Sequence, residues 1–247
     1  MTELLPSIIL MTIFYPVYFT RNEAVVRLLT HHASPSIIMP YRSTEKTRQK
    51  KDAKRTAMMQ AAVRVFAEKG YHTATIRDVV SEADVAIGTF YFYFPDKETL
   101  FVHLYEETAD FLLQAIAQAI NSRATFPQKV SAALQAYVSI AVYEPAVVQM
   151  LLVGGVGAVP SLEIKRADFR ERLTNIWQRP VDASIEKLEM PPQNGRRTAE
   201  ALAGAFDEVV LNLLLQPEPE LEADAAVHDM VDFALRATGY RAATSHH

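Results

Sequence analysis

The sequence predicts an all-α fold: a small N-terminal three-helix unit joined by a long helix to a larger C-terminal helical body. Gly is sparse, with 8 residues in 247, and residues of high helix propensity dominate. Apolar residues recur at helical spacing, and capping residues or Pro and Gly breaks separate one run from the next. We expect four segments, namely 1–40, 41–97, 98–240 and a frayed tail at 241–247.

The composition limits the possible chemistry. The chain has no Cys, which excludes a disulfide framework, a thiolate metal site and a Cys nucleophile, and fits a reducing cytoplasm. The net charge of −4 is unevenly distributed, because residues 41–100 are net +3 and residues 101–247 are net −7. Residues 41–55 alone carry seven basic and two acidic side chains. Such a run fits either phosphate neutralisation or a solvated helix end.

Residues 1–40 are unusual for the start of a globular protein. Residues 4–20 form a nearly uncharged apolar run that is about one turn short of the ~20 residues a spanning helix needs, and Pro6 and Pro16 interrupt it. This segment is a membrane anchor, a folded extension, or upstream sequence translated from a misassigned start. The third interpretation is preferred, because Met39 directly precedes a typical basic arm, and no membrane partner is then expected.

The first helix is expected to run from the basic arm to about Lys69. Its apolar residues share one face, namely Met58, Ala62, Val65 and Phe66. Gly70 supplies the residue after the helix end.

Residues 75–100, TIRDVVSEADVAIGTFYFYFPDKETL, predict a helix-turn-helix. Thr75 is a good N-cap, and Asp78 makes an imperfect capping box with it. Asp84 occupies the turn, and residues 85–94 form the second helix. Phe90 and Phe94 are four residues apart and should pack inward, which leaves the neighbouring aromatic side chains exposed.

This stretch resembles the DNA-binding domain of the TetR family of bacterial transcriptional regulators over about 45 residues. The matching residues are Ala61, Ala62, Phe66, Gly70, Tyr71, Thr75, Ile76, Val79, Ala83, Val85, Gly88–Phe94 and Lys97–Leu100. The resemblance implies that Thr75 holds a phosphate at a helix N-terminus and that Thr89, Tyr91, Tyr93 and Lys97 contact backbone phosphates. It also implies that the residues nearest the base edges are Ala86, Ile87, Gly88 and Phe92.

Three positions depart from the family pattern. Asp84 stands where Gly is usual, and Asp tolerates the left-handed region better than most residues. Ala86 replaces a small hydroxylated residue, so one phosphate or capping contact is lost. Ile87 replaces a residue that is often polar or basic, so readout there should be apolar, for example against a thymine methyl group.

The remaining chain predicts further helices at about 101–122, 127–142, 161–187 with a possible bend at Pro180, 198–215 and 221–237. Glu144 and Pro145 open another helix in the stretch EPAVVQMLLVGGVGAVP. The glycines at 154, 155 and 157 do not form a phosphate loop, because no Lys-Ser/Thr follows and no strand precedes. They are interpreted as a closely packed helix end. His103 and Glu107 share a helix face, but no third metal ligand is visible.

The resemblance implies a cytoplasmic, nucleoid-associated homodimeric repressor that binds a pseudo-palindromic double-stranded DNA operator and is relieved by a small effector. The candidate pocket side chains suggest that this effector is apolar. No cofactor or metal is expected, and the protein is expected not to be an enzyme. Effector-pocket candidates are Phe111, Tyr137, Tyr143, Met150 and Trp177, although the same side chains would make an ordinary core. Dimer-interface candidates, on the last two helices, are Leu202, Phe206, Val209, Leu213, Met230 and Ala234. The alternatives are a regulator tethered to the membrane through residues 4–20 and an all-α enzyme.

Overall fold

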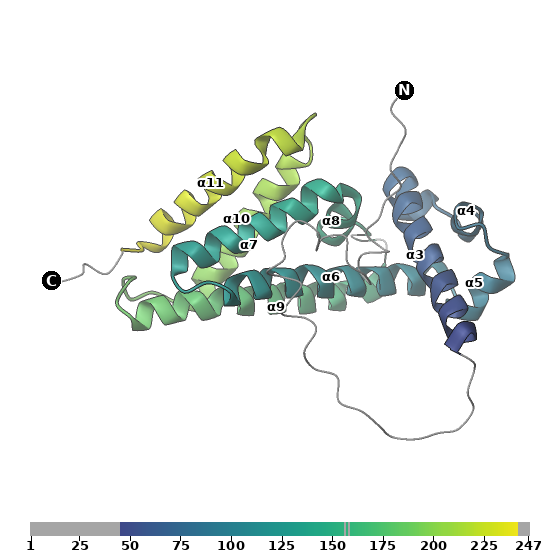
Figure 1. Cartoon of the computed structure of the whole chain (residues 1–247), viewed down its shortest axis with the longest axis horizontal. Helices are drawn as coiled ribbons and strands as arrows, with labels where there is room; N and C mark the ends of the chain where they lie inside the picture. The colour runs from purple at the N-terminus through teal and green to yellow at the C-terminus, as the bar shows by residue number, and fades with distance from the viewer. Residues whose placement is uncertain (1–44, 156, 158, 242–247) are drawn as a thin grey trace, which may run out of the picture. The chain divides into compact units, whose positions relative to one another are not determined.

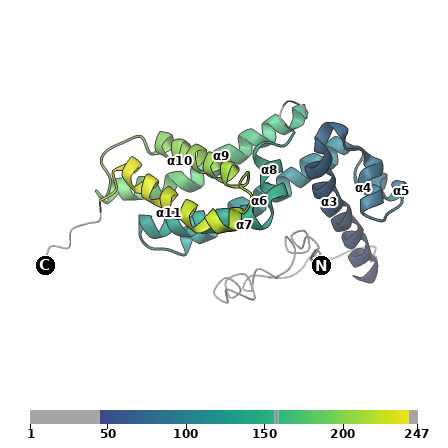
Figure 2. The same cartoon turned by 90° about the horizontal axis from the view of Figure 1, so that it is seen from above.

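The computed structural model describes residues 45–155, 157 and 159–241, with side chains from residue 53 onward. The expectations for residues 1–40, for residues 41–44 of the basic arm and for the tail after residue 241 lie outside the described residues. Within them the regular structure is entirely helical, which confirms the all-α prediction (Figures 1 and 2). Every helix in this part of the chain is too short or too polar to cross a lipid bilayer.

The chain divides into two compact units, and the division falls inside a helix between Leu100 and Phe101. The first unit contains α4 (Ile76–Glu82), α5 (Ile87–Tyr93) and α3 (Glu45–Thr73) apart from residues 70–72, which belong to the second unit. Gly70 interrupts α3 with a φ of 71°, at the residue where the sequence predicts the helix to end. The conformation is natural for Gly, which has no Cβ.

The second unit is built from six helices in the described part of the chain, including most of α6. They are α6 (Lys97–Asn121), α7 (Phe126–Tyr143), α8 (Pro145–Leu152), α9 (Pro160–Glu186), α10 (Gly195–Leu213) and α11 (Pro219–Thr238). Each corresponds to a predicted helix, with its ends shifted by a few residues. α9 continues through Pro180.

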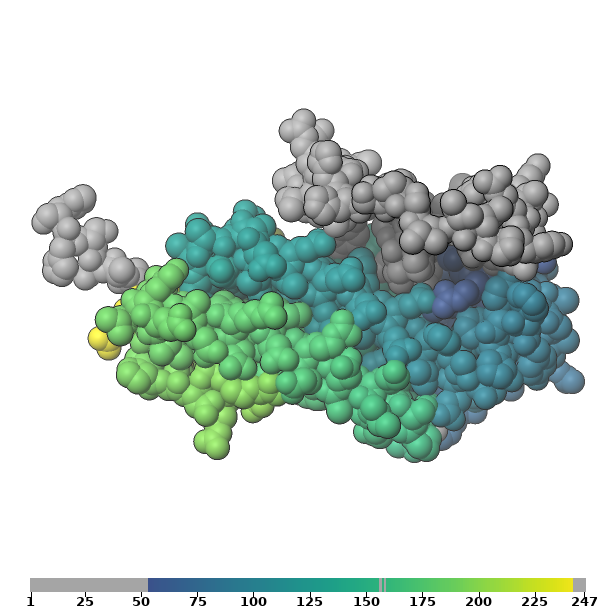
Figure 3. All heavy atoms as spheres, turned by 90° about the horizontal axis from the view of Figure 1, so that it is seen from below, coloured from purple at the N-terminus to yellow at the C-terminus, as the bar shows by residue number. Residues whose placement is uncertain are grey.

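Two helix pairs and a buried aromatic core hold the second unit together. α9 packs against α10, α7 packs against α11, and α10 contacts α11. Ion pairs join α6 to α9, one between Lys165 and Glu106 and one between Arg172 and Asp110 at 2.7 Å. Because these side chains are all partly exposed, the pairs orient the helices more than they stabilise them. α9 forms part of the molecular surface, in green in Figure 3.

The connection after α8 supports the interpretation of its glycines as close packing. A Cβ on Gly154 would lie 2.6 Å from the Met150 carbonyl oxygen. A Cβ on Gly155, whose φ is 67°, would lie 2.8 Å from the Phe101 ring. Side chains at both positions would therefore collide with the body of the unit.

Candidate nucleic-acid interface and the interior of the helical body

Buried aromatic side chains fix the rotation of α5. Phe90 and Phe94 are 0% and 1% exposed, with ring centroids 5.8 Å apart, as their spacing predicts. The guanidinium of Arg55, from the basic end of α3, lies 5.8 Å from the Phe94 ring centroid. With this face committed to the core, the other residues of α5 must face outward.

The outward face of α5 is apolar and aromatic. Ile87, Tyr91 and Phe92 are 45%, 55% and 66% exposed. Gly88 is also exposed, and an added Cβ there would meet nothing within 4 Å. Exposed side chains of this size are uncommon on a monomeric surface, and a short helix that presents several marks an interaction surface.

The remaining predicted contact residues on α5 border this exposed face. Thr89 and Tyr93 are half-buried, and the Tyr93 ring packs edge-on against Phe92 at 4.9 Å. Ala86 is exposed and is the N-cap residue of α5, but it makes no side-chain capping bond. This agrees with the expected loss of a capping contact, because Ala has no hydroxyl.

The turn between α4 and α5 is made by Asp84, whose φ is 51°. Asp therefore adopts the left-handed conformation at the position where the family usually has Gly, as expected from its tolerance of that region. The Val85 amide donates to the Val80 carbonyl oxygen at 3.0 Å, which closes the turn.

A full capping box forms at the start of α4. The Asp78 amide donates to Thr75 Oγ1 at 3.2 Å, and Asp78 Oδ2 accepts from the Thr75 amide and hydroxyl, each at 2.8 Å. Lys69 Nζ donates to Asp78 Oδ1 at 2.8 Å and, together with the Thr75 bonds, lowers the pKa of Asp78 to about 2. The Thr75 hydroxyl is thus engaged within the unit, and its phosphate contact stays a prediction.

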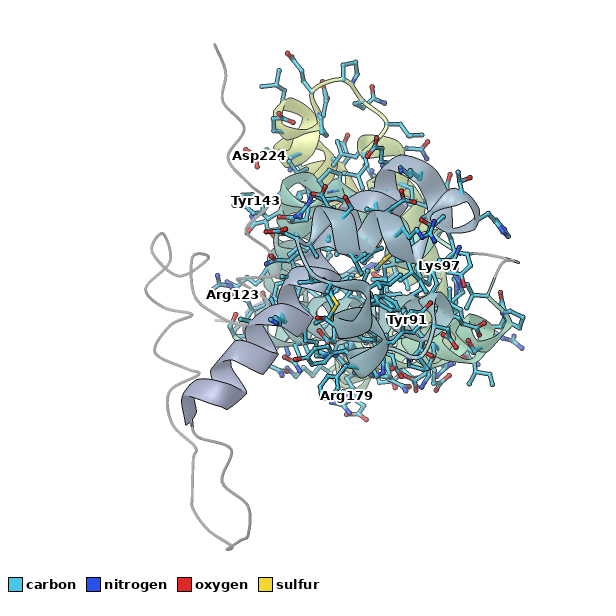
Figure 4. All side chains as sticks on the ribbon, turned by 90° about the vertical axis from the view of Figure 1, so that its right-hand side faces the viewer. Tyr91, Lys97, Arg123, Tyr143, Arg179 and Asp224 are labelled. Carbon is cyan, nitrogen blue, oxygen red and sulfur yellow. The ribbon has the colours of Figure 1, made fainter. Side chains whose placement is uncertain are left out.

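Lys97 brings a positive charge to this helix start. Its Nζ donates to the Ala74 carbonyl oxygen at 2.8 Å, directly before Thr75, and partial burial lowers its pKa. Tyr91 and Lys97 are both labelled in Figure 4. Two of the five predicted phosphate-contact residues, Thr75 and Lys97, therefore make hydrogen bonds within the unit.

The five predicted effector-pocket residues differ in their exposure to solvent. Tyr137, Met150 and Trp177 are buried, Phe111 is half-buried, and Tyr143 is 53% exposed. Trp177 packs on Phe206 with ring centroids 5.0 Å apart, as an ordinary core residue does. These three buried residues fit the alternative that the sequence left open, a packed core.

A different set of residues lines a small cavity in the second unit. Its volume is about 10 Å³, enough for roughly one water-sized group. It is lined by Tyr105 from α6, Leu151 and Leu152 from α8, Arg166, Phe169 and Arg170 from α9, and Asp207 from α10. We refer to it as the α6–α10 cavity.

Asp207 is the buried acid of this cavity. It is 8% exposed, and Tyr137 donates its hydroxyl to Oδ1 at 2.8 Å. Burial raises the pKa of Asp207 to about 6, against the opposing effects of the Tyr137 bond and of Arg170. Burial also raises the pKa of Tyr105 to about 12, so its phenol is neutral and can donate a hydrogen bond. The sequence carries one signal for this site, the adjacent acidic residues Asp207 and Glu208 inside the otherwise apolar run of α10.

Comparison with known proteins identifies the first unit. Residues 58–104 match the model of the bacterial regulatory proteins of the tetR family. Over these residues the chain resembles the TetR family of bacterial regulators. The fatty acid metabolism regulator protein of Bacillus subtilis (strain 168) is 30% identical over 92 residues, which are 37% of this chain and 47% of that protein. The chain thus spans about half the length of this relative.

Three further proteins match most of the chain. The regulator BetI of Rhizobium meliloti (strain 1021) is 26% identical over 75% of this chain and 91% of its own length. The structure of FadR from Bacillus subtilis in complex with stearoyl-CoA has a TM-score of 0.63 at 21% identity, covering 71% of this chain and 96% of that one. A tetR-family protein from Rhodococcus RHA1 has a TM-score of 0.64 at 23% identity, covering 76% and 98%. These structures share the TetR fold with the chain.

The dimer-interface candidates lie mostly inside the chain's own core. Five of the six are at most 5% exposed, namely Leu202, Phe206, Leu213, Met230 and Ala234. Val209, at 38%, is the exposed member of the set. Burial follows because α10 uses its apolar faces against α9 and α11 of the same chain. A partner chain would therefore meet the exposed neighbours of these residues.

The His103 and Glu107 pair gains no metal-site partners. The described residues contain no group of three or more His, Asp or Glu side chains placed to hold a metal ion. His103 is exposed on α6.

Proposed function

We propose that this TetR-family chain is a DNA-binding transcriptional repressor that reads a pseudo-palindromic operator as a homodimer and is released by a small molecule. The observation that carries the proposal is the exposed face of α5, formed by Ile87, Tyr91 and Phe92 after a tight turn. A short helix held by its buried aromatics and exposed on its other side is suited to the DNA major groove. Such a role locates the protein at the nucleoid, in the cytoplasm.

The contacts divide by their expected role. Tyr91, Tyr93, Thr89 and Lys97 would supply hydroxyl and ammonium donors for backbone phosphates, and such contacts position the helix without reading sequence. Ala86, Ile87, Gly88 and Phe92 present apolar or small surfaces to the base edges. Apolar readout distinguishes thymine methyl groups, and specificity elsewhere depends on DNA shape.

The proposed dimer interface uses the exposed side of α10 and α11. Ala201, Gly204, Ala205 and Val209 are at least partly exposed along α10, and Phe233 is 46% exposed on α11. Gly204 is informative, because Gly in an exposed helix interior costs about 1 kcal/mol relative to Ala. A close approach by a partner helix explains a small residue there. Paired α10 and α11 helices would form a four-helix interface and set the half-sites about 34 Å apart.

The proposed effector carries an apolar chain. Leu151, Leu152 and Phe169 supply apolar walls to the α6–α10 cavity. The FadR structure of similar fold holds stearoyl-CoA, which supports an acyl compound. An effector that binds the α6–α10 cavity would favour the conformations in which the two recognition helices do not fit the operator, and induction is then a population shift.

The deciding experiment is selection of genomic fragments by the purified full-length protein. We expect enrichment of a fragment with two half-sites one DNA turn apart, bound with an affinity that falls steeply as salt is raised. Tyr91→Ala should weaken binding to every enriched fragment alike, because a phosphate contact carries no sequence information.

Tyr143→Ala is the matched control, since Tyr143 is a tyrosine of nearly equal exposure in the second unit. It should leave operator affinity unchanged. Failure to enrich any fragment over a random pool, at low salt and without effector, would overturn the proposed function.

A further inference from the structure

We propose that the α6–α10 cavity recognises an anionic group on the effector, held by Tyr105, Arg166 and Arg170. This inference rests on the proposed function, in that the bound compound is taken to be the effector. The inference means that the effector carries an anionic group in addition to its expected apolar chain.

Unsatisfied polar atoms mark the cavity and the helix that forms one of its walls. The Tyr105 hydroxyl lies in a side chain only 1% exposed and has no hydrogen-bond partner among the described residues. Thr108, one turn further along α6, is 2% exposed, and its Oγ1 is equally unpaired within that part of the chain. Arg166 Nε is a third such atom. Because burying an unpaired polar group is costly, a site that keeps several is arranged to receive a partner.

Arg166 is held in a fixed orientation beside Tyr105. Its two terminal nitrogens donate to the Leu152 carbonyl oxygen at 2.9 Å and the Gly154 carbonyl oxygen at 2.6 Å. Its guanidinium lies 5.8 Å from the Tyr105 ring centroid. Both acceptors are neutral carbonyls, so the positive charge of Arg166 is not neutralised by these bonds.

Arg170 adds a second cation one helical turn further along α9. It lines the cavity while remaining exposed to solvent, so it joins the interior to the surface. Its charge acts on Tyr105, Tyr137 and Asp207, favouring the ionised form of each. A carboxylate or phosphate arriving from solvent would meet this guanidinium first.

Asp207 is the one acid that lines the cavity, and it decides which ligand charge is preferred. Its Oδ1 already accepts the Tyr137 hydroxyl, and two arginines oppose one carboxylate. The excess of cations and of unpaired donors therefore favours an anion over an amine.

The size of the cavity restricts how a ligand enters. Its volume of about 10 Å³ accommodates a single oxygen of the anionic group. The rest of the ligand requires α8 and α9 to separate along Leu151, Leu152 and Phe169, the apolar part of the lining. Ligand binding is thereby coupled to movement of two helices.

A series of compounds with one chain and different head groups tests the proposal. The probes are dodecanoate, dodecanoyl-CoA, dodecanol and dodecylamine, titrated into the full-length protein. Trp177, the only tryptophan, is buried against Phe206, which directly precedes Asp207, so its fluorescence reports binding. We expect dodecanoate or dodecanoyl-CoA to bind at least about tenfold more tightly than the alcohol and the amine. The ratio of the two anions separates a carboxylate from a phosphate as the recognised group.

Arg170→Gln should reduce the preference for anions by about tenfold, and Tyr105→Phe should weaken anion binding. Asp207→Asn should tighten it, because a competing negative charge is removed. Arg179→Gln is the matched control, an exposed arginine of the same helix that does not line the cavity. The Arg179→Gln variant should bind all four probes as the native protein does.

Equal binding of alcohol and carboxylate, tighter binding of the amine, or an unchanged preference in Arg170→Gln would overturn the inference. Fragment selection on the same protein preparation keeps the two proposals separate. A selected operator without any head-group preference contradicts the cavity proposal alone. Arg170-dependent anion binding by a protein that selects no DNA contradicts the proposed function alone.

Discussion

At the scale of single residues, Asp207 combines burial with a titratable charge. Its pKa is raised to about 6 in the folded protein from an ordinary 3.8. A raised carboxyl pKa means that the folded state binds the proton more tightly than the unfolded state. The contribution of protonated Asp207 to folding stability is therefore complete below about pH 4 and is lost as the pH rises through about 6.

Asp207→Asn should keep a neutral acceptor for Tyr137 at every pH. The variant should be more stable than the native protein at about pH 7.5, by about 3 kcal/mol, with the difference disappearing near pH 4. Urea unfolding of both proteins between these pH values measures this. A difference that is independent of pH would show that Asp207 does not titrate in this way.

Ile87 tests the side of α5 assigned to base edges. It is 45% exposed at the start of the helix, where an apolar side chain replaces a position that is often polar or basic in the family. Ile87→Lys should change which operator variants are preferred, favouring sites with guanine at the contacted position by about 1–3 kcal/mol. Binding to a library of operator variants measures the ranking. An unchanged ranking, with uniformly tighter binding, would mean that residue 87 lies over phosphate instead.

The sequence predicts residue positions well where a local pattern decides them. Phe90 and Phe94 are buried because four-residue spacing puts them on one side of a helix that packs on that side. The cavity could not be predicted in this way, because its walls come from α6, α8, α9 and α10. Side chains such as Trp177 and Tyr137 are large and apolar enough for either a core or a pocket, and only packing distinguishes the two.

At the scale of elements, the turn between α4 and α5 sets where the exposed helix begins. Asp84 holds a φ of 51°, a conformation that costs a residue with a Cβ about 1 kcal/mol and costs Gly almost nothing. Asp84→Gly should therefore stabilise the native protein by a few tenths to about 1 kcal/mol, partly offset by the greater freedom of Gly in the unfolded chain.

Asp84→Val should destabilise the protein by more than about 1 kcal/mol, since a β-branched residue fits the left-handed backbone region worst. Thermal unfolding of both variants at one pH provides the comparison. If Asp84→Val were as stable as Asp84→Gly, the turn would not have the described backbone. Helix boundaries nearby were predictable from Gly70 and Thr75, because each acts through its own local hydrogen bonds or backbone freedom.

At the scale of the whole molecule, the proposed homodimer explains residues that the single chain does not need. The sequence predicts the interface on the last two helices, but it could not divide their apolar residues between the chain's own core and a partner. α10 is apolar on several faces, and α9 and α11 cover most of them. What remains exposed is smaller in side-chain size, with Ala201, Gly204 and Ala205 along one side.

Gly204→Arg is the variant that isolates this interface. A Cβ at residue 204 would meet nothing within 4 Å in the chain, so the fold should accept the substitution and even gain helix propensity. In a dimer the same side chain would separate the two α10 helices, and its charge would be buried or repelled. Sedimentation should show the native protein as a dimer and the variant as a folded monomer.

Operator affinity should fall when dimerisation is lost. A monomer contacts one half-site and loses the gain from two linked contacts. Gln118→Arg, an exposed position of α6 with the same change of charge, is the control and should remain dimeric with full affinity. A Gly204→Arg protein that stays dimeric and binds the operator normally would place the interface on another surface. A monomer that still bound the full operator with native affinity would instead separate DNA recognition from dimerisation.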